Sequence, residues 1–279
     1  MISTTYKETM TPRERVMNAL SGNPVDRTPI ANPTNVATVE LMDLVDAPFP
    51  EACQDPELAA RLAATGYTEL GFDSISPYFS IIQESSALGC EMQWEEKDNW
   101  PTVRMYNPVW KDSRDVRVPE NFLEHRDVKV ITESIRILKQ EYGDEVAIIG
   151  KTMGPWTLAY HVFGVESFLL GTVDNPEETM RSLHKLKEIS VLFGQAQIDA
   201  GADVVEIGIP FSDPVMDGPI IQMANDSSID SGSTPVTILN DLRAESPASP
   251  LAVMTYYNLA YRMGHERVAA SLASAGISG

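Results

Sequence analysis

Two carboxylate side chains, Glu206 and Asp217, have surroundings that acid–base chemistry requires. Glu206 sits within an apolar run over 204–209, so its carboxyl group is expected to lose hydration in the fold. A carboxyl group in such a place suits general acid/base catalysis. Asp217 follows eleven residues later, in a segment rich in proline that we expect to be a loop. Two carboxylates in different surroundings can divide the proton transfers of one reaction between them.

The elements that position these residues alternate between strands and helices. Strands are expected over 27–32, 70–76, 146–150, 203–209 and 251–256, and helices over 12–20, 36–45, 56–65, 131–142, 176–200, 237–243 and 265–275. Residues 89–125 carry no sustained period and predict an irregular β-ribbon with loops. This alternation predicts an α/β fold of the (β/α)8 TIM-barrel type. About five core strands are expected, whereas a closed barrel has eight, so we expect the barrel to be incomplete. Catalytic groups of such barrels lie at the C-terminal ends of the strands.

Composition limits the classes of partner. The formal net charge of −19 would repel phosphate backbones and anionic lipid surfaces, so neither nucleic acid nor a membrane is an expected partner. No apolar run is long enough to span a bilayer, and the first residues lack the apolar centre of a secretory signal, so a cytoplasmic location is expected. Cys53 and Cys90 stand apart, without a CxxC pattern, and are expected to be reduced.

The first 203 residues carry a consistent series of motifs. In order they are ERVMNALSGNPVDRTPI, ELGFDSISPYF, EVAIIGKTMGPWTLAYHVFG and QIDAGADV. This part resembles the uroporphyrinogen decarboxylase superfamily, and within it the corrinoid-dependent methyltransferases that pass a methyl group from methylcobamide to coenzyme M. The resemblance implies a zinc-bound thiolate, with zinc ligands from a His-x-Cys segment and a later cysteine. None of the four histidines is followed by a cysteine two residues on, so we expect no metal site and no cofactor.

Three residues near the end of the predicted strand 146–150 have two possible interpretations. Lys151, Trp156 and His161 could line the barrel mouth, because they lie at or just past the C-terminal end of a strand. Alternatively, Trp156 and His161 could simply pack a loop and the start of a helix. We favour packing, and the sequence therefore assigns no catalytic role to this part of the chain.

From residue 199 onward the motifs change. The runs AGADVVEIGIPFSDPVMDGPIIQ, LAVMTYYNLAYRMG and AASLASAGISG resemble the α chain of tryptophan synthase. The two resemblances together predict a composite chain, with one partial barrel over 1–203 and a second over 204–279. The join falls near 199–204, where AGAD stands at a helix-to-strand step in both families.

The second resemblance implies a reaction for the two carboxylates. That reaction is the retro-aldol cleavage of indole-3-glycerol phosphate to indole and glyceraldehyde 3-phosphate. Glu206 matches the acid/base residue, and Asp217 matches the carboxylate that stabilises the indole nitrogen. Tyr256 and Asn258 match positions near the substrate pocket. The tryptophan synthase β chain is an implied partner, through the loop 212–219.

Three functions remain open at this point. The first is the α-type lyase, with weak or no turnover expected because the turns that hold the substrate phosphate are not found in the sequence. The second is a methyltransferase-like or decarboxylase-like protein without its zinc site. The third is a non-catalytic hybrid fragment whose exposed strand edges pair with another chain.

Overall fold

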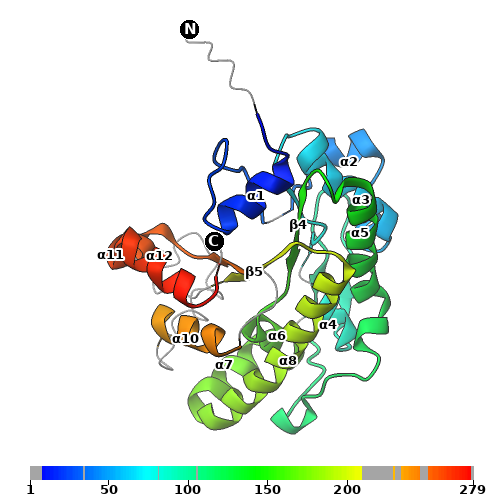
Figure 1. Cartoon of the computed structure of the whole chain (residues 1–279). Helices are drawn as coiled ribbons and strands as arrows, with labels where there is room; N and C mark the ends of the chain where they lie inside the picture. The colour runs from blue at the N-terminus through cyan, green and yellow to red at the C-terminus, as the bar shows by residue number, and fades with distance from the viewer. Residues whose placement is uncertain are drawn as a thin grey trace.

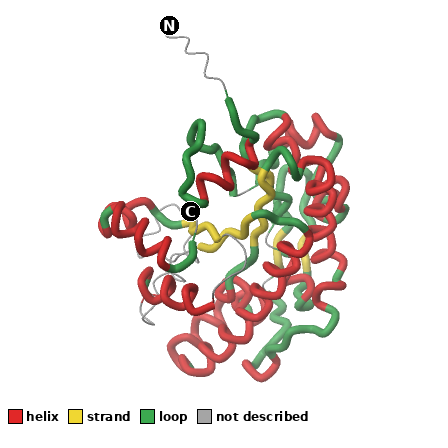
Figure 2. The backbone as a smooth tube through the Cα atoms, viewed as in Figure 1, coloured by secondary structure: helices red, strands yellow, loops and turns green. Residues whose placement is uncertain are grey.

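A four-stranded parallel sheet forms the centre of the fold. The computed structural model describes residues 8–33, 35–80, 82–104, 106–208, 229, 234–245 and 251–277. The strands are β1 (Ser74–Ile75), β4 (Ala147–Lys151), β5 (Val204–Gly208) and β6 (Leu251–Met254), in the order β1-β4-β5-β6. Figure 2 shows these strands at the centre of the molecule with helices around them.

Helices follow most of the strands and lie outside them (Figure 1). They are α1 (Pro12–Leu20), α2 (Val39–Val45), α3 (Pro56–Thr68), α4 (Gln83–Ala87), α5 (Arg126–Tyr142), α6 (Pro155–Phe163), α7 (Val165–Asp174), α8 (Pro176–Ala200), α10 (Pro235–Glu245), α11 (Tyr257–Met263) and α12 (His265–Ser274). Residues 92–103 contain the antiparallel pair β2 (Met92–Gln93) and β3 (Thr102–Val103), which confirms the predicted ribbon. The short 3-10 helices are η1 (Glu51–Cys53), η2 (Ser113–Asp115) and η3 (Phe122–Glu124).

Local signals in the sequence explain where several helices begin and end. Thr11 caps α1 and forms a capping box with Glu14, and Asp55 caps α3 through its side chain. Gly201 ends α8 with a φ of 115°, a left-handed conformation that glycine adopts without strain. The chain therefore turns directly from α8 into β5, the strand that carries Glu206.

The strand expected over 27–32 does not form. The carboxylate of Asp73 takes the place of a ladder partner there, because Ile30 N donates to Asp73 Oδ2 at 2.6 Å. One backbone bond remains, from Asp73 N to Ile30 O at 2.9 Å. The segment thus runs beside β1 without joining the sheet, and the described residues contain four parallel strands where about five were expected.

Buried ion pairs stabilise the edge of the sheet where the parallel strands begin. Arg15 is fully buried and contacts both Asp26 and Asp73 at 2.6 Å. Asp203, directly before β5, accepts hydrogen bonds from Arg13 Nη2 at 2.8 Å and Lys139 Nζ at 2.9 Å. The other oxygen of Asp203 accepts from the backbone N–H of Ile148 in β4 at 3.0 Å. One carboxylate thus ties the start of β5 to α1, α5 and β4.

Most of the buried apolar residues belong to two clusters. The larger one takes its members from between Leu41 and Ala202, and the smaller one contains Leu239, Leu251, Ala275 and Ile277. Helices α11 and α12 contain no buried residues. Cys53 and Cys90 are free thiols in the larger cluster. In the described part of the chain, no helix is both long and apolar enough to cross a membrane.

Candidate functional site

Glu206 lies where the sequence analysis expected it, inside β5 and close to its C-terminal end. Its backbone pairs with Lys151 in β4 on one side and with Ala252 in β6 on the other. The side chain is only 4% exposed. The expected loss of hydration is therefore present.

A cation faces this buried carboxylate. Lys151 Nζ lies 3.1 Å from Glu206 Oε2, and its side chain is 26% exposed. The contact is an ion pair, and Oε2 receives no hydrogen bond. This oxygen therefore keeps its capacity to accept one. The sequence analysis assigned no catalytic role to Lys151, and the only signal for it was its place at the end of a predicted strand.

The pair points to the face of the sheet that a barrel encloses. On the opposite face, β4 packs closely on α8, where a Cβ added to Gly150 would lie 3.0 Å from Gln197 Oε1. Since side chains alternate along a strand, Lys151 points away from α8. Because parallel strands place their C-terminal ends at one edge, Lys151 and Glu206 together form a charged layer at the barrel mouth.

Helix α8 and the buried helix α4 fix the end of β4. Gln197 of α8 accepts from Lys151 N at 3.0 Å and donates to Lys151 O at 2.8 Å. Two residues on, Met153 O accepts from Ser190 Oγ at 2.6 Å, and Met153 N donates to Glu84 Oε1 at 2.8 Å. The backbone that carries Lys151 is thus held by side chains, not only by the sheet.

Glu84 itself is fully buried. Burial raises its pKa, against the opposing effect of the hydrogen bonds from Met153 N and Tyr78 Oη. Because Tyr78 follows β1 and Met153 follows β4, this carboxyl group joins the segments after two neighbouring strands. Sequence reasoning did not find Glu84, which no motif distinguishes.

A further buried polar atom follows β1. Ser76 is 4% exposed, and its Oγ has no hydrogen-bond partner. Buried hydroxyl groups in proteins are normally paired with protein or water. The strand register places Ser76 level with Ile149, two residues before Lys151 and on the same face of the sheet.

Of the other three predicted site residues, the structure describes two. Asp217 lies outside the described residues. Tyr256 directly precedes α11 and is half-buried, while Asn258 is exposed in the first turn of that helix. Both follow β6, the neighbour of β5, and so lie beyond the same edge of the sheet as Glu206.

Trp156 and His161 pack into the interior. The ring of Trp156 lies edge-on to Phe168, with 4.9 Å between the ring centroids. His161 is buried, and its Nδ1 lies 2.7 Å from Ser85 Oγ. Burial lowers the pKa of His161 to about 4, so the ring is neutral at pH 7. These contacts agree with the packing interpretation of both side chains.

The described residues do not fit the zinc site that the first resemblance implies. No three His, Cys, Asp or Glu side chains among them gather closely enough to hold a metal ion. Burial raises the pKa of the Cys53 and Cys90 thiols to about 12, whereas a zinc ligand must be a thiolate. We therefore derive no step through zinc.

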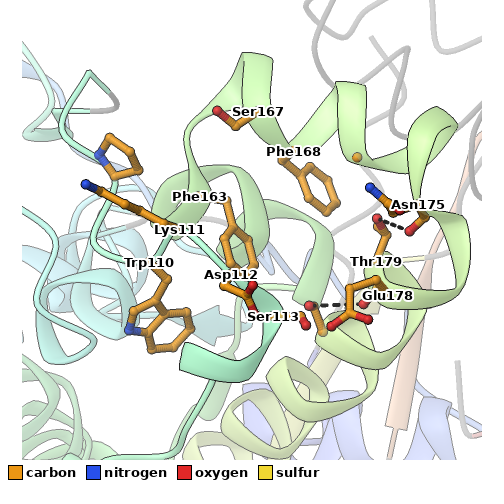
Figure 3. Close-up of a pocket in the computed structure, with 13 residues that line it drawn as sticks. Trp110, Lys111, Asp112, Ser113, Phe163, Ser167, Phe168, Asn175, Glu178 and Thr179 are labelled. Atoms are coloured by element: carbon orange, nitrogen blue, oxygen red, sulfur yellow. Dashed lines mark hydrogen bonds between the residues drawn. The ribbon is translucent and has the colours of Figure 1, made fainter.

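A cavity of about 330 Å³ lies between the segment 108–113 and helices α6 to α8 (Figure 3). Neither Lys151 nor Glu206 lines it. The aromatic rings of Trp110, Phe163 and Phe168 are among its lining groups. None of the site residues predicted from the sequence lines it. The hydroxyl groups of Thr179 and Ser182, on its α8 side, donate to carbonyls of their own helix.

Comparison with known proteins shows which family the chain belongs to. Residues 11–210 match the family described as uroporphyrinogen decarboxylase (URO-D), which is more than half of the chain. The chain belongs to the URO-D family. Methylcobamide:CoM methyltransferase MtaA of Methanosarcina barkeri is 32% identical over 209 residues, covering 75% of this chain and 61% of that protein. The chain thus spans about three fifths of the length of this curated relative.

A solved structure extends the likeness beyond residue 210. The methyltransferase from Methanosarcina mazei matches 97% of this chain and 75% of its own, with a TM-score of 0.76 and 28% sequence identity. This confirms the predicted α/β fold of the TIM-barrel type. The C-terminal strand and helices therefore follow a methyltransferase barrel in their arrangement.

The C-terminal part nevertheless matches a second family by sequence. Residues 180–279 match the tryptophan synthase alpha chain family. The alpha chain of Methanoregula boonei is 45% identical over 96 residues, covering 33% of this chain and 36% of that protein. The two matched ranges overlap over 180–210, the α8–β5 step that contains AGAD. Both predicted resemblances are confirmed; Lys151 lies in the URO-D range alone, whereas Glu206 lies where the two ranges overlap.

Proposed function

We propose that this chain is a methyltransferase-like member of the URO-D family that binds coenzyme M at the mouth of its barrel. The proposal rests on the likeness to methylcobamide:CoM methyltransferase MtaA over 209 residues and on the URO-D match, whose range covers β1, β4 and β5. Coenzyme M carries a sulfonate group, and Lys151 offers a partly exposed cation for it at the mouth. Since the described residues hold no zinc ligand set, the proposal covers binding of coenzyme M and assigns no transfer step.

Calorimetry with the full chain tests this proposal. Coenzyme M should bind with a Kd below about 1 mM, a binding free energy of about −4 kcal/mol. Lys151→Met should abolish the binding, whereas Lys129→Met, which removes an exposed lysine paired with Glu124, should leave it unchanged. Dialysis against zinc followed by metal analysis should leave the chain without bound zinc. Absence of coenzyme M binding would reject the proposal.

A second candidate function follows from Glu206. This residue lies in the part that is similar to tryptophan synthase alpha chains, and it occupies a buried position at the end of a barrel strand. The candidate is the cleavage of indole-3-glycerol phosphate with Glu206 as acid/base residue and Asp217 beside the indole nitrogen. Tyr256 and Asn258 would then lie near the substrate. Release of indole should be lost in Glu206→Gln, and an unchanged rate in that variant would remove this candidate.

The same likeness suggests a protein partner. We propose the tryptophan synthase β chain, with the loop 212–219 as the contact, and a division of the chain at residues 203 and 204. Sedimentation of the chain with a purified β chain checks the first point, because a complex should sediment faster than either protein. No change in sedimentation would count against the partnership.

A further inference from the structure

We propose that the Lys151–Glu206 pair gives the barrel mouth an additional activity, the exchange of the proton next to the carbonyl group of a small α-hydroxycarbonyl compound. This activity goes beyond binding of coenzyme M and beyond cleavage of indole-3-glycerol phosphate. It requires neither zinc nor a phosphate-binding turn. It follows from the positions of three described side chains.

The first step concerns the charges. A carboxylate removes a proton from carbon efficiently only when a positive group stabilises the negative charge that develops on the carbonyl oxygen. Lys151 Nζ, 3.1 Å from Glu206 Oε2, supplies such a group beside the base. An ammonium has three N–H donors, so Lys151 can contact the carboxylate and a carbonyl oxygen together.

The second step concerns the surroundings. Glu206 shares its face of the sheet with Val204 of its own strand and Ile149 of β4, and both of these apolar residues are buried. Electrostatic stabilisation is stronger in such a place than in water. The side chain of Lys151 is 26% exposed and that of Glu206 is 4% exposed, so a small molecule would approach past the lysine.

The third step concerns the hydroxyl group of the substrate. Ser76 Oγ is buried and unpaired on the same face of the sheet, level with Ile149 and thus two residues deeper in the barrel than Lys151. A substrate hydroxyl can both donate to and accept from a serine hydroxyl, which would satisfy this atom. An α-hydroxycarbonyl compound therefore offers one group to Lys151, one to Ser76 and an acidic C–H to Glu206.

The reaction balances without a further reactant. The C–H bond breaks and its proton passes to a carboxylate oxygen of Glu206. The electron pair of that bond forms the C=C bond of an enediolate, and the former carbonyl π pair moves to the oxygen that accepts from Lys151 Nζ. After the carboxyl proton exchanges with solvent, the reverse step returns a solvent hydrogen to carbon.

Proton NMR of dihydroxyacetone in D2O with the full chain measures this exchange directly. The methylene signal should decay faster than in buffer alone. Glu206→Gln should slow the enzyme-dependent decay by about 10²-fold or more, the usual contribution of a general base. Lys151→Met should slow it strongly as well. Glu124→Gln and Lys129→Met, which remove a surface Lys–Glu pair, should leave the rate unchanged.

Two further variants keep the test decisive if Lys151→Met fails to fold. Lys151→Arg retains a cation that can donate to the carbonyl oxygen, so this variant should retain proton exchange. Glu206→Asp should retain folding with slower exchange. The proposal is overturned if Glu206→Gln exchanges the proton at the wild-type rate, or if a folded Lys151→Arg variant shows no exchange. It is also overturned if Glu124→Gln and Lys129→Met lower the exchange rate as much as Glu206→Gln and Lys151→Met do.

Discussion

Lys151 Nζ lies 3.1 Å from Glu206 Oε2, and of the two residues only Glu206 also lies in the range that matches the tryptophan synthase alpha chain family. The backbone register of β4 and β5 places them side by side. The α8–β5 step lies in both matched ranges, and β5 pairs with β4 on one side and with β6 on the other.

Asp203→Asn should destabilise the fold by weakening the link between the start of β5 and the rest of the barrel. The substitution keeps the shape but removes the charge that holds Arg13 and Lys139. We expect the free energy of unfolding to fall by about 1–3 kcal/mol, measured by urea denaturation. Asp112→Asn is the matched control, because its partner Arg114 is mostly exposed, and it should change stability little. If the two substitutions lower the free energy of unfolding by the same amount, the ion pairs of Asp203 stabilise the fold no more than an exposed pair does.

Gly150→Ala should disturb the packing of α8 on β4. The added methyl group would lie 3.0 Å from Gln197 Oε1 and 3.4 Å from Gln197 Cβ. We expect a loss of about 1–3 kcal/mol, as overpacking usually costs. Gly154→Ala serves as control, because nothing lies within 4 Å of its added Cβ. A thermal melting temperature for Gly150→Ala equal to that of Gly154→Ala would contradict the close packing.

His161 should make the stability depend on pH between about 6.5 and 4. Burial lowers its pKa to about 4 in the folded chain, while the unfolded chain binds the proton near its ordinary value of 6.5. Its stabilising contribution is therefore complete above pH 6.5 and is lost as the pH falls to about 4, a change of about 3 kcal/mol.

The comparison of variants isolates this effect from other acid-sensitive groups. His161→Gln should flatten the fall in unfolding free energy over that pH range, whereas His184→Gln, at an exposed position of α8, should not. Urea denaturation at pH 7 and pH 4.5 gives the comparison. If the unfolding free energies of the wild type and His161→Gln fall by the same amount between pH 7 and pH 4.5, the histidine is protonated in the folded chain.

Elements with a strong local signal could be predicted from the sequence. The proline at the first position of the helix, Pro176, and the glycine at 201 define α8, and the apolar runs define β4 and β5 to within one residue at each end. The strand expected over 27–32 did not form because a side chain distant in sequence, Asp73, binds the N–H of Ile30. Such competition leaves no local pattern.

The site was predicted only in part, for a similar reason. The burial of Glu206 followed from its apolar neighbours, but the approach of Lys151 depends on the register between β4 and β5, which no motif specifies. Glu84 and Gln197, which hold the backbone around Lys151, come from helices whose polar residues look like surface positions in the sequence. The assignments of Asp217, Tyr256 and Asn258 remain predictions.

A double-mutant cycle on Lys151 and Glu206 tests most directly whether the two side chains meet at the barrel mouth. The unfolding free energies of the wild type, Lys151→Met, Glu206→Gln and the double variant give the coupling energy. A contact of 3.1 Å with a carboxylate that is 4% exposed predicts a coupling of about 1 kcal/mol or more. A coupling within about 0.3 kcal/mol of zero would contradict the contact, because residues that do not touch behave additively.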